Sequence, residues 1–311
     1  MTVGIRAIAA YVPERTLDLK GADGVGLGLD PSFIDEKTGF ARVARKAEGE
    51  DTSDLAVAAV RELLRDEPSL LDKIGLLVLV TQNPDGQGLP HCSAIVHGKL
   101  ELPESVAAFD ISLGCSGWVY ALSVAKSFME ANRIAHGLLV TADPYSKVMD
   151  PADRNTVSLF GDAAAATWLT DEAPVWDVSD FVFGTRGRQH AQLEVDDEGV
   201  LRMNGRGVFN FSATVVPQTV SEVLSKSGRQ MSDVDLVLLH QGSRFIVDTV
   251  AQRLKAEDRT PFVASHLGNT VSSTIPIAIA EGALRDSQVS VVCGFGVGLS
   301  WAAAILEKRN T

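Results

Sequence analysis

Four short runs of consecutive apolar residues punctuate the chain, at positions 76–80, 138–141, 236–239 and 289–292. Leucine and valine dominate these runs, whose length is that of a buried strand and too short for a helix. Apolar stretches of helix-like length cover 118–129 and 274–284. Continuously apolar strands that alternate with helices are typical of sheets covered on both faces, so the pattern predicts an α/β fold.

The pattern occurs twice along the chain. The run that ends at Gln82 reappears with its end at Gln241, 159 residues later (241 − 82). The triplet Leu-Gly-Cys that ends at position 115 reappears as Leu-Gly-Asn, which ends at position 269. We therefore expect two similar halves, 1–170 and 171–311, packed as α/β/α/β/α layers. Equivalent strand ends and helix starts of the two halves would then converge at a pseudo-two-fold junction.

Cys115 lies in a turn of small residues between a strand-like segment and the apolar helical stretch. A thiol at a helix N-terminus feels the positive end of the helix dipole, which lowers its pKa and favours the thiolate. The alternative is a cysteine that only packs, because free cysteines are among the most buried residues. We assign that structural role to Cys92 and Cys293, which lack such a turn.

His240 follows the run 236–239, and strand ends are where α/β proteins bind ligands. A single histidine is more often structural than catalytic, so it is the repeat that distinguishes His240. Asn269 occupies the position in the second half that Cys115 occupies in the first, also at a helix start. Cysteine, histidine and asparagine on converging ends would provide a nucleophile and two donors, a set that suits acyl transfer.

Composition narrows the classes of function. The net charge is −12, which leaves no basic stripe for nucleic acid. Three widely spaced cysteines fit a reducing cytoplasm better than a disulfide framework or a zinc cluster. No apolar run reaches the roughly 18 residues of a membrane span, so we expect a cytoplasmic protein without a membrane partner. The glycine-rich segment 294–298 lacks the βαβ unit that a dinucleotide site requires.

Taken together, the motifs resemble the β-ketoacyl-acyl-carrier-protein synthase III family of the thiolase superfamily over nearly the whole chain. They are specific as an ordered set: Thr38-Gly39-Phe40, Ala108-Phe109-Asp110 ahead of Cys115, Asp150-Pro151-Ala152-Asp153-Arg154, Phe160-Gly161-Asp162-Ala163-Ala164-Ala165, His240-Gln241, Gly268-Asn269-Thr270 and a Gly-x-Gly-x-Ser-Trp segment from Gly296. The resemblance implies a thiolase-like fold, which agrees with the two expected halves.

The resemblance also implies a reaction. Cys115 would accept an acyl group from a coenzyme A or phosphopantetheine thioester. His240 and Asn269 would assist decarboxylation of a malonyl-type extender and stabilise the enolate that attacks the acyl-cysteine. The backbone N–H groups of Cys115 and Val297 would form the oxyanion hole, each donor supplying about 3–4 kcal/mol. The implied partners are acyl-CoA, an acyl carrier protein and a second copy of the chain, and no metal or other cofactor is implied.

The same resemblance assigns substrate-binding positions, some of which depart from the family. Phe33 stands where a tryptophan often stacks on the adenine, and Lys37 stands where an arginine follows. Leu89 replaces a phenylalanine that closes the acyl pocket across the dimer, and Val297 replaces a glycine. The implied substrate contacts are Phe33, Lys37, Leu89, Arg154, Gly205, Arg206, Phe209, Ser243 and Phe295, and the implied carrier-protein contacts are Arg244, Arg253 and Lys255.

These departures suggest a specialised relative that accepts a non-acetyl donor in a fatty-acid, polyketide or secondary-metabolite pathway. Two alternatives stay open. One is acyl transfer to an oxygen or nitrogen nucleophile without decarboxylation, and the other is a non-catalytic acyl-binding subunit. The intact set of Cys115, His240 and Asn269 argues against the second alternative.

Overall fold

The computed structural model describes residues 2–309. Its strands are β1 (Gly4–Tyr11), β2 (Thr16–Asp18), β3 (Arg42–Ala44), β4 (Leu76–Val80), β5 (Ala107–Ile111), β6 (His136–Ala142), β7 (Ala164–Thr170), β8 (Trp176–Thr185), β9 (Leu193–Val195), β10 (Leu201–Met203), β11 (Leu236–Leu239), β12 (Val289–Gly296) and β13 (Ser300–Lys308). Its helices are α1 (Ala22–Gly26), α2 (Pro31–Phe33), the π-helical turn η1 (Ile34–Thr38), α3 (Thr52–Leu64), α4 (Cys92–Lys99), α5 (Gly117–Asn132), α6 (Arg154–Val157), α7 (Gly205–Lys226), α8 (Arg244–Leu254) and α9 (Thr274–Ala280), with short 3-10 turns between them.

Within residues 2–309, nine strands form one mixed sheet in the order β11-β12-β13-β8-β1-β7-β6-β4-β5. The sheet has two leaves, joined where Ile5 of β1 pairs with Trp176 of β8. Each leaf repeats one pattern. In one leaf β1 pairs antiparallel with β7, and β7 pairs antiparallel with β6. In the other leaf β8 pairs antiparallel with β13, and β13 pairs antiparallel with β12. Strands β6 and β12 then pair parallel with β4 and β11. The strand order thus has the symmetry that two similar halves would give, whereas their division at 170/171, between β7 and β8, stays a prediction.

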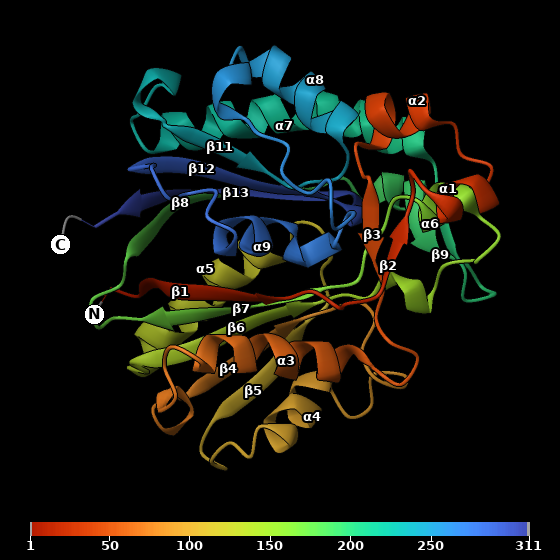
Figure 1. The fold of residues 1–311 in the computed structure, drawn as a ribbon. Helices are drawn as coiled ribbons and strands as arrows, with labels where there is room; N and C mark the ends of the chain where they lie inside the picture. Colours follow the sequence, from red (N-terminus) through yellow and green to blue (C-terminus); the bar gives the residue numbers. More distant parts are fainter. Residues whose placement is uncertain (1, 310–311) are drawn as a thin grey trace.

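The two leaves and their helices form five layers, which Figure 1 shows from the side. Helices α3 and α4 cover the outer face of the leaf that contains β4. Helices α7 and α8 cover the outer face of the leaf that contains β11. Helices α5 and α9 lie between the leaves and pack against both. The mixed α/β fold and the α/β/α/β/α layering that the sequence predicts are confirmed.

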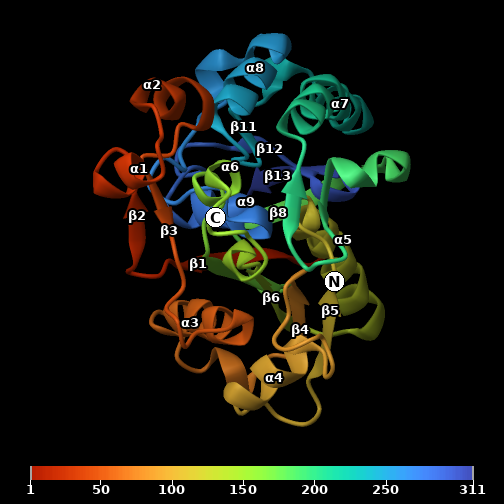
Figure 2. The same cartoon turned by 90° about the vertical axis from the view of Figure 1, so that its right-hand side faces the viewer.

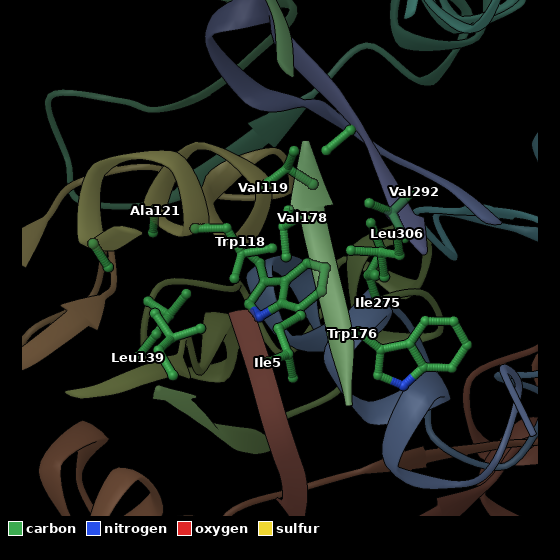
Figure 3. Packing of buried hydrophobic residues seen from close by; sticks show 14 of the residues in the cluster. Ile5, Trp118, Val119, Ala121, Leu139, Trp176, Val178, Ile275, Val292 and Leu306 are labelled. Atoms are coloured by element: carbon green, nitrogen blue, oxygen red, sulfur yellow. The ribbon is translucent and has the colours of Figure 1, made fainter. Parts of the chain in front are cut away.

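The central layer holds the largest side chain of the core. Trp118 of α5 is 1% exposed and packs in a cluster with Ile5 of one leaf and Val178 of the other (Figure 3). Its indole Nε1 donates to the hydroxyl of Thr167 at 3.1 Å, so the one polar group of this side chain is buried with a partner. A single hydrophobic cluster therefore ties the two leaves together.

The predicted elements agree with the structure except at one end. The runs 76–80 and 236–239 are β4 and β11, and the stretch 118–129 lies within α5. The helix predicted over 274–284 is wrong at its C-terminus, because α9 ends at Ala280. Gly282 adopts a left-handed φ of 97°, and its N–H donates to the carbonyl oxygen of Ile279. A left-handed glycine with such bonds is a common way to close a helix.

Short elements of the first half gather at one end of the sheets. Figure 2 looks onto this end, where α1, α2, β2, β3 and α6 lie in front of the layers. Among the residues that the structure describes, no helix combines the length and the apolar character that a bilayer crossing requires. No three His, Cys, Asp or Glu side chains among them are placed to hold a metal ion.

Candidate active site

A cavity of about 460 Å³ brings the three predicted catalytic residues together. Cys115, His240 and Asn269 all line it, although they lie on different elements and are each 5% exposed or less. The rest of its wall comes from α2 and η1, the segment before β7, the short strands β9 and β10, the N-terminal parts of α7 and α8, and the end of β12. These wall residues are Phe33, Lys37, Thr38, Leu159, Phe160, Leu193, Met203, Gly205, Arg206, Val208, Phe209, Ser212, Gly242, Ser243, Phe245, Ile246, Phe295 and Gly296.

Cys115 lies just before Ser116, the N-cap residue of α5. The preceding turn is tight, because the N–H of Gly117 donates to the carbonyl oxygen of Gly114 at 2.7 Å. Opposite the thiol, a Cβ atom at Gly296 would lie 2.7 Å from the Cys115 sulfur. Only a glycine at position 296 leaves that sulfur its present space.

Burial raises the pKa of the Cys115 thiol to about 12, and the charge of Asp143 acts in the same direction. The backbone N–H groups of Val297 and Cys115 oppose this rise without cancelling it. The prediction that the helix N-terminus lowers this pKa is therefore wrong in its net direction. Desolvation of a thiolate at a fully buried site outweighs these hydrogen bonds, so the thiol is protonated at neutral pH.

His240 directly follows β11, and its backbone N–H donates to the carbonyl oxygen of Cys293 at 2.8 Å. Its Nδ1 lies 2.7 Å from the hydroxyl oxygen of Thr274, and its ring meets Phe295 edge-on at 5.5 Å between centroids. Burial lowers the pKa of His240 to about 3, so the imidazole is neutral. With Nδ1 occupied, Nε2 is the nitrogen left to serve the cavity.

Asn269 is held by a short parallel bridge to Phe160. Its backbone N–H donates to the carbonyl oxygen of Leu159 at 2.8 Å, and its carbonyl oxygen accepts from Gly161 at 2.9 Å. Its side-chain Oδ1 accepts from the N–H of Val271 at 3.0 Å. Because the carbonyl end of the carboxamide is fixed, its Nδ2 amide is the donor available to a ligand.

Most of the predicted substrate contacts line this cavity. Lys37 places its Nζ 4.3 Å from the ring centroid of Phe245, and Phe245 stacks on Phe209 at 4.9 Å. Together with Phe33 these residues form an aromatic rim with one cation. The other predicted contacts on the wall are Gly205, Arg206, Ser243 and Phe295.

Three predicted positions are not on the cavity wall. Leu89 is 94% exposed. Arg154 begins α6, and its guanidinium donates to the carbonyl oxygen of Gly28 at 3.1 Å. Val297 lines a neighbouring cavity instead, although its N–H interacts with the Cys115 sulfur. The roles assigned to these residues stay predictions.

The predicted carrier-protein contacts lie at the two ends of α8. Arg244 holds its guanidinium 4.7 Å from the ring centroid of Phe262, and Arg253 donates to the carbonyl oxygen of Ala213 at 2.6 Å. Lys255 caps the helix in a left-handed conformation. Two of the three cations thus also have contacts within the chain, and their docking role stays a prediction.

Sequence reasoning missed the residues that act through shape or through another side chain. Thr274 fixes the ring of His240, and Gly296 leaves room for the Cys115 sulfur. Met203 and Val208 supply apolar wall. The glycine was already part of a recognised motif, whereas the threonine and the apolar residues have no chemical signature that would distinguish them from packing residues.

Comparisons with known proteins identify relatives of the whole chain. A model of the 3-oxoacyl-[acyl-carrier-protein (ACP)] synthase III family matches residues 109–187, and the model of its C-terminal region matches residues 224–308. The β-ketoacyl-[acyl-carrier-protein] synthase III of Deinococcus deserti is 32% identical and aligns with 99% of this chain and 91% of its own length. That of Staphylococcus haemolyticus is 30% identical over 99% of both chains.

Solved structures of the same enzymes superpose over almost the whole chain. A 3-oxoacyl-(acyl-carrier-protein) synthase III has a TM-score of 0.91 at 32% identity, and covers 99% of this chain and 100% of its own. The enzyme from Pseudomonas aeruginosa has a TM-score of 0.90 at 30% identity, with 100% and 99% covered. The priming β-ketosynthase of the R1128 polyketide pathway has a TM-score of 0.87 at 25% identity, with 100% and 97% covered. The thiolase-like fold is thereby confirmed, and the chain belongs to the 3-oxoacyl-[acyl-carrier-protein] synthase III family of condensing acyltransferases.

Proposed function

We propose that the chain catalyses decarboxylative condensation of an acyl thioester with a malonyl-type thioester, through an acyl group carried on Cys115. The observation that carries the proposal is one cavity lined by a buried thiol, a neutral imidazole and a carboxamide. The names of the relatives support the proposal, because a 3-oxoacyl or β-ketoacyl synthase forms the product that such a condensation yields.

In the first half-reaction, the Cys115 sulfur attacks the carbonyl carbon of the donor thioester. A bond forms between Sγ and that carbon, the bond from the carbon to the donor sulfur breaks, and the thiol proton passes to the departing thiolate. Neutral His240 is suited to relay this proton. The N–H groups of Val297 and Cys115, which already act on the sulfur, would stabilise the oxyanion that forms.

In the second half-reaction, the extender loses its carboxylate as carbon dioxide, and the electron pair of the broken bond forms an enolate. The enolate oxygen accepts hydrogen bonds from His240 Nε2 and Asn269 Nδ2. The enolate carbon then attacks the acyl carbonyl, a carbon–carbon bond forms, and the bond from Cys115 Sγ to the acyl carbon breaks. The released thiolate takes up a proton, which restores the resting thiol.

Thr274 supports both states of His240 that these steps require. Its hydroxyl lies 2.7 Å from Nδ1 and 3.4 Å from the carbonyl oxygen of Val271. When it donates to that carbonyl oxygen, it can accept from Nδ1–H, which leaves Nε2 as a base for acylation. When it donates to Nδ1, the proton resides on Nε2, which becomes the donor that decarboxylation requires.

The proposed pathway is specialised fatty-acid, polyketide or secondary-metabolite synthesis. The priming ketosynthase of a polyketide pathway is among the structures that cover the whole chain. The aromatic rim, with Phe33 and with Lys37 directed at Phe245, supports a nucleotide contact different from that of a tryptophan and arginine pair. The proposed partners are acyl-CoA or an acyl carrier protein, together with a second copy of the chain, and no metal or redox cofactor is needed for these steps.

Intact-protein mass spectrometry followed by a decarboxylation assay tests the proposal. We expect acyl-CoA or acyl-carrier donors to add the mass of one acyl group, and a malonyl thioester then to release carbon dioxide and discharge the protein. Cys115→Ala should abolish loading. Cys92→Ala removes another buried thiol, which does not line the cavity of Cys115. It is the matched control and should still accept the acyl group.

Each alternative has its own outcome in this assay. Loading followed by transfer to an oxygen or nitrogen acceptor without carbon dioxide would overturn the condensation in favour of simple acyl transfer. Absence of loading from every donor would point to a non-catalytic acyl-binding subunit.

A further inference from the structure

A second cavity, of about 300 Å³, adjoins the first beside the nucleophile. Leu193 lines both cavities. Tyr145, on the wall of the second, packs in one buried cluster with Cys115. Gln82, also on that wall, closes over the residue before the nucleophile: a Cβ atom at Gly114 would lie 2.5 Å from Gln82 Oε1. The wall of the second cavity therefore includes side chains that pack against Cys115 and against Gly114, the residue before it.

The wall of this cavity carries the polar side chains of Gln82, Asn83 and Tyr145, and Asp143, which does not line the cavity, is hydrogen-bonded to them. The Tyr145 hydroxyl donates to Gln82 Oε1 at 2.9 Å. Asp143 Oδ1 accepts from the backbone N–H of Gln82 and from Asn83 Nδ2, both at 3.0 Å. Asp143 and Tyr145 are 1% and 3% exposed. Buried polar groups are costly unless they are paired, and these hydrogen bonds hold Gln82 and Tyr145 in place on the cavity wall.

Gln82 and Tyr145 keep hydrogen-bonding capacity that no described residue uses and that a ligand could use. The carbonyl oxygen of Gln82 is occupied by Tyr145, whereas its Nε2 amide donates to none of the residues 2–309. The Tyr145 oxygen donates its proton to Gln82 and keeps its acceptor capacity. The wall thus offers a donor and an acceptor close together.

An acyl chain on Cys115 would extend into this second cavity, and we propose that Gln82 and Tyr145 make the cavity select short chains that carry a hydroxyl or carbonyl oxygen. The inference rests on acylation of Cys115, the proposed function. Gln82 Nε2 would donate to the substituent oxygen, and a hydroxyl substituent could also donate to the Tyr145 oxygen. An unsubstituted chain would desolvate the Gln82 amide without replacing its hydrogen bonds, and sites of this kind discriminate against ligands that lack the polar group.

Rates of Cys115 acylation from matched donors test the selection. Butanoyl-CoA, 3-hydroxybutanoyl-CoA and 3-oxobutanoyl-CoA have the same carbon chain and differ at one position. We expect at least one of the two oxygenated donors to load about tenfold faster than butanoyl-CoA in a single-turnover mass measurement. Gln82→Leu keeps much of the volume and removes the amide, so the ratio of the two rates should fall to about one. Gln218→Leu, at an exposed position on α7, is the matched control and should keep the wild-type ratio.

The outcomes separate this proposal from the proposed function. Equal loading from all three donors, or an unchanged ratio in Gln82→Leu, would overturn the selection while leaving acylation of Cys115 in place. No loading from any donor would instead remove the proposed function. Should Gln82→Leu fail to fold, Tyr145→Phe removes a single oxygen from the same set, and an unchanged ratio in that variant would overturn the selection equally.

Discussion

Cys115 and His240, the proposed nucleophile and base, both rest uncharged. Burial raises the pKa of Cys115 to about 12 and lowers that of His240 to about 3, so at neutral pH the cavity that both line holds a thiol and a neutral imidazole, and no ion pair forms. A thiolate would appear only when a bound thioester offers its carbonyl carbon and the oxyanion donors take up the charge. A neutral thiol also resists oxidation, because thiolate is the reactive form.

The pH dependence of Cys115 alkylation distinguishes burial from the helix dipole. Since a raised pKa leaves the thiol protonated far above pH 7, the thiolate fraction, and with it the rate of iodoacetamide modification, should rise about tenfold per pH unit from pH 7 to 10. Peptide mapping assigns the modification to position 115, with Cys115→Ala as the control. A plateau of the rate near pH 7–8 would contradict the raised pKa and restore the dominance of the helix N-terminus.

At the scale of elements, the sequence pattern predicted the strands and helices that occur in both halves. It did not predict the end of one helix or the side-chain contacts on the cavity wall. Strands β4 and β11 could be predicted because both faces are buried, and Cys115 and Asn269 because each begins a helical segment at the same place in its half. The end of α9 depended on the backbone of Gly282, which composition does not reveal. The polar wall at Gln82 and Tyr145 depended on contacts over a separation of 63 residues.

The turn that presents Asn269 requires a glycine for two separable reasons. Gly268 has a left-handed φ of 83°, and a Cβ atom there would lie 2.7 Å from Val43 Cγ1 and 3.1 Å from the backbone N of Gly161. Gly228 has a similar φ of 68° with nothing within 4 Å. Gly228→Ala should therefore lower the free energy of unfolding by about 1–2 kcal/mol, the cost of the left-handed conformation alone.

Gly268→Ala should cost about 2–4 kcal/mol, because backbone strain and a clash add together. Urea unfolding of both variants measures the difference in free energy of unfolding. Because Gly268 precedes Asn269, the same variant should also slow carbon dioxide release, whereas Gly228→Ala should leave it unchanged. Equal destabilisation of the two variants would mean that the contacts with Val43 and Gly161 relax freely.

At the scale of the whole molecule, the active site depends on both leaves holding their relative position. Cys115 precedes α5 in the central layer, His240 follows β11 of one leaf, and Asn269 bridges to the segment before β7 of the other. The leaves are joined directly by the Ile5–Trp176 pair, and otherwise through the cluster around α5 and α9. The geometry of the candidate active site therefore depends on the central layer, which holds the two leaves in their relative position.

Trp118 is the side chain through which this coupling can be tested. Replacing it with alanine removes a buried indole in contact with both leaves, so Trp118→Ala should lower the free energy of unfolding by about 3–5 kcal/mol. Val25→Ala, at a side chain 79% exposed, is the control and should change this free energy little. Because the cluster is shared, hydrogen exchange of β4 and of β11 amides should accelerate by the same factor in Trp118→Ala. Loss of protection in β4 with β11 unaffected would mean that the leaves unfold independently and that the central layer does not couple them.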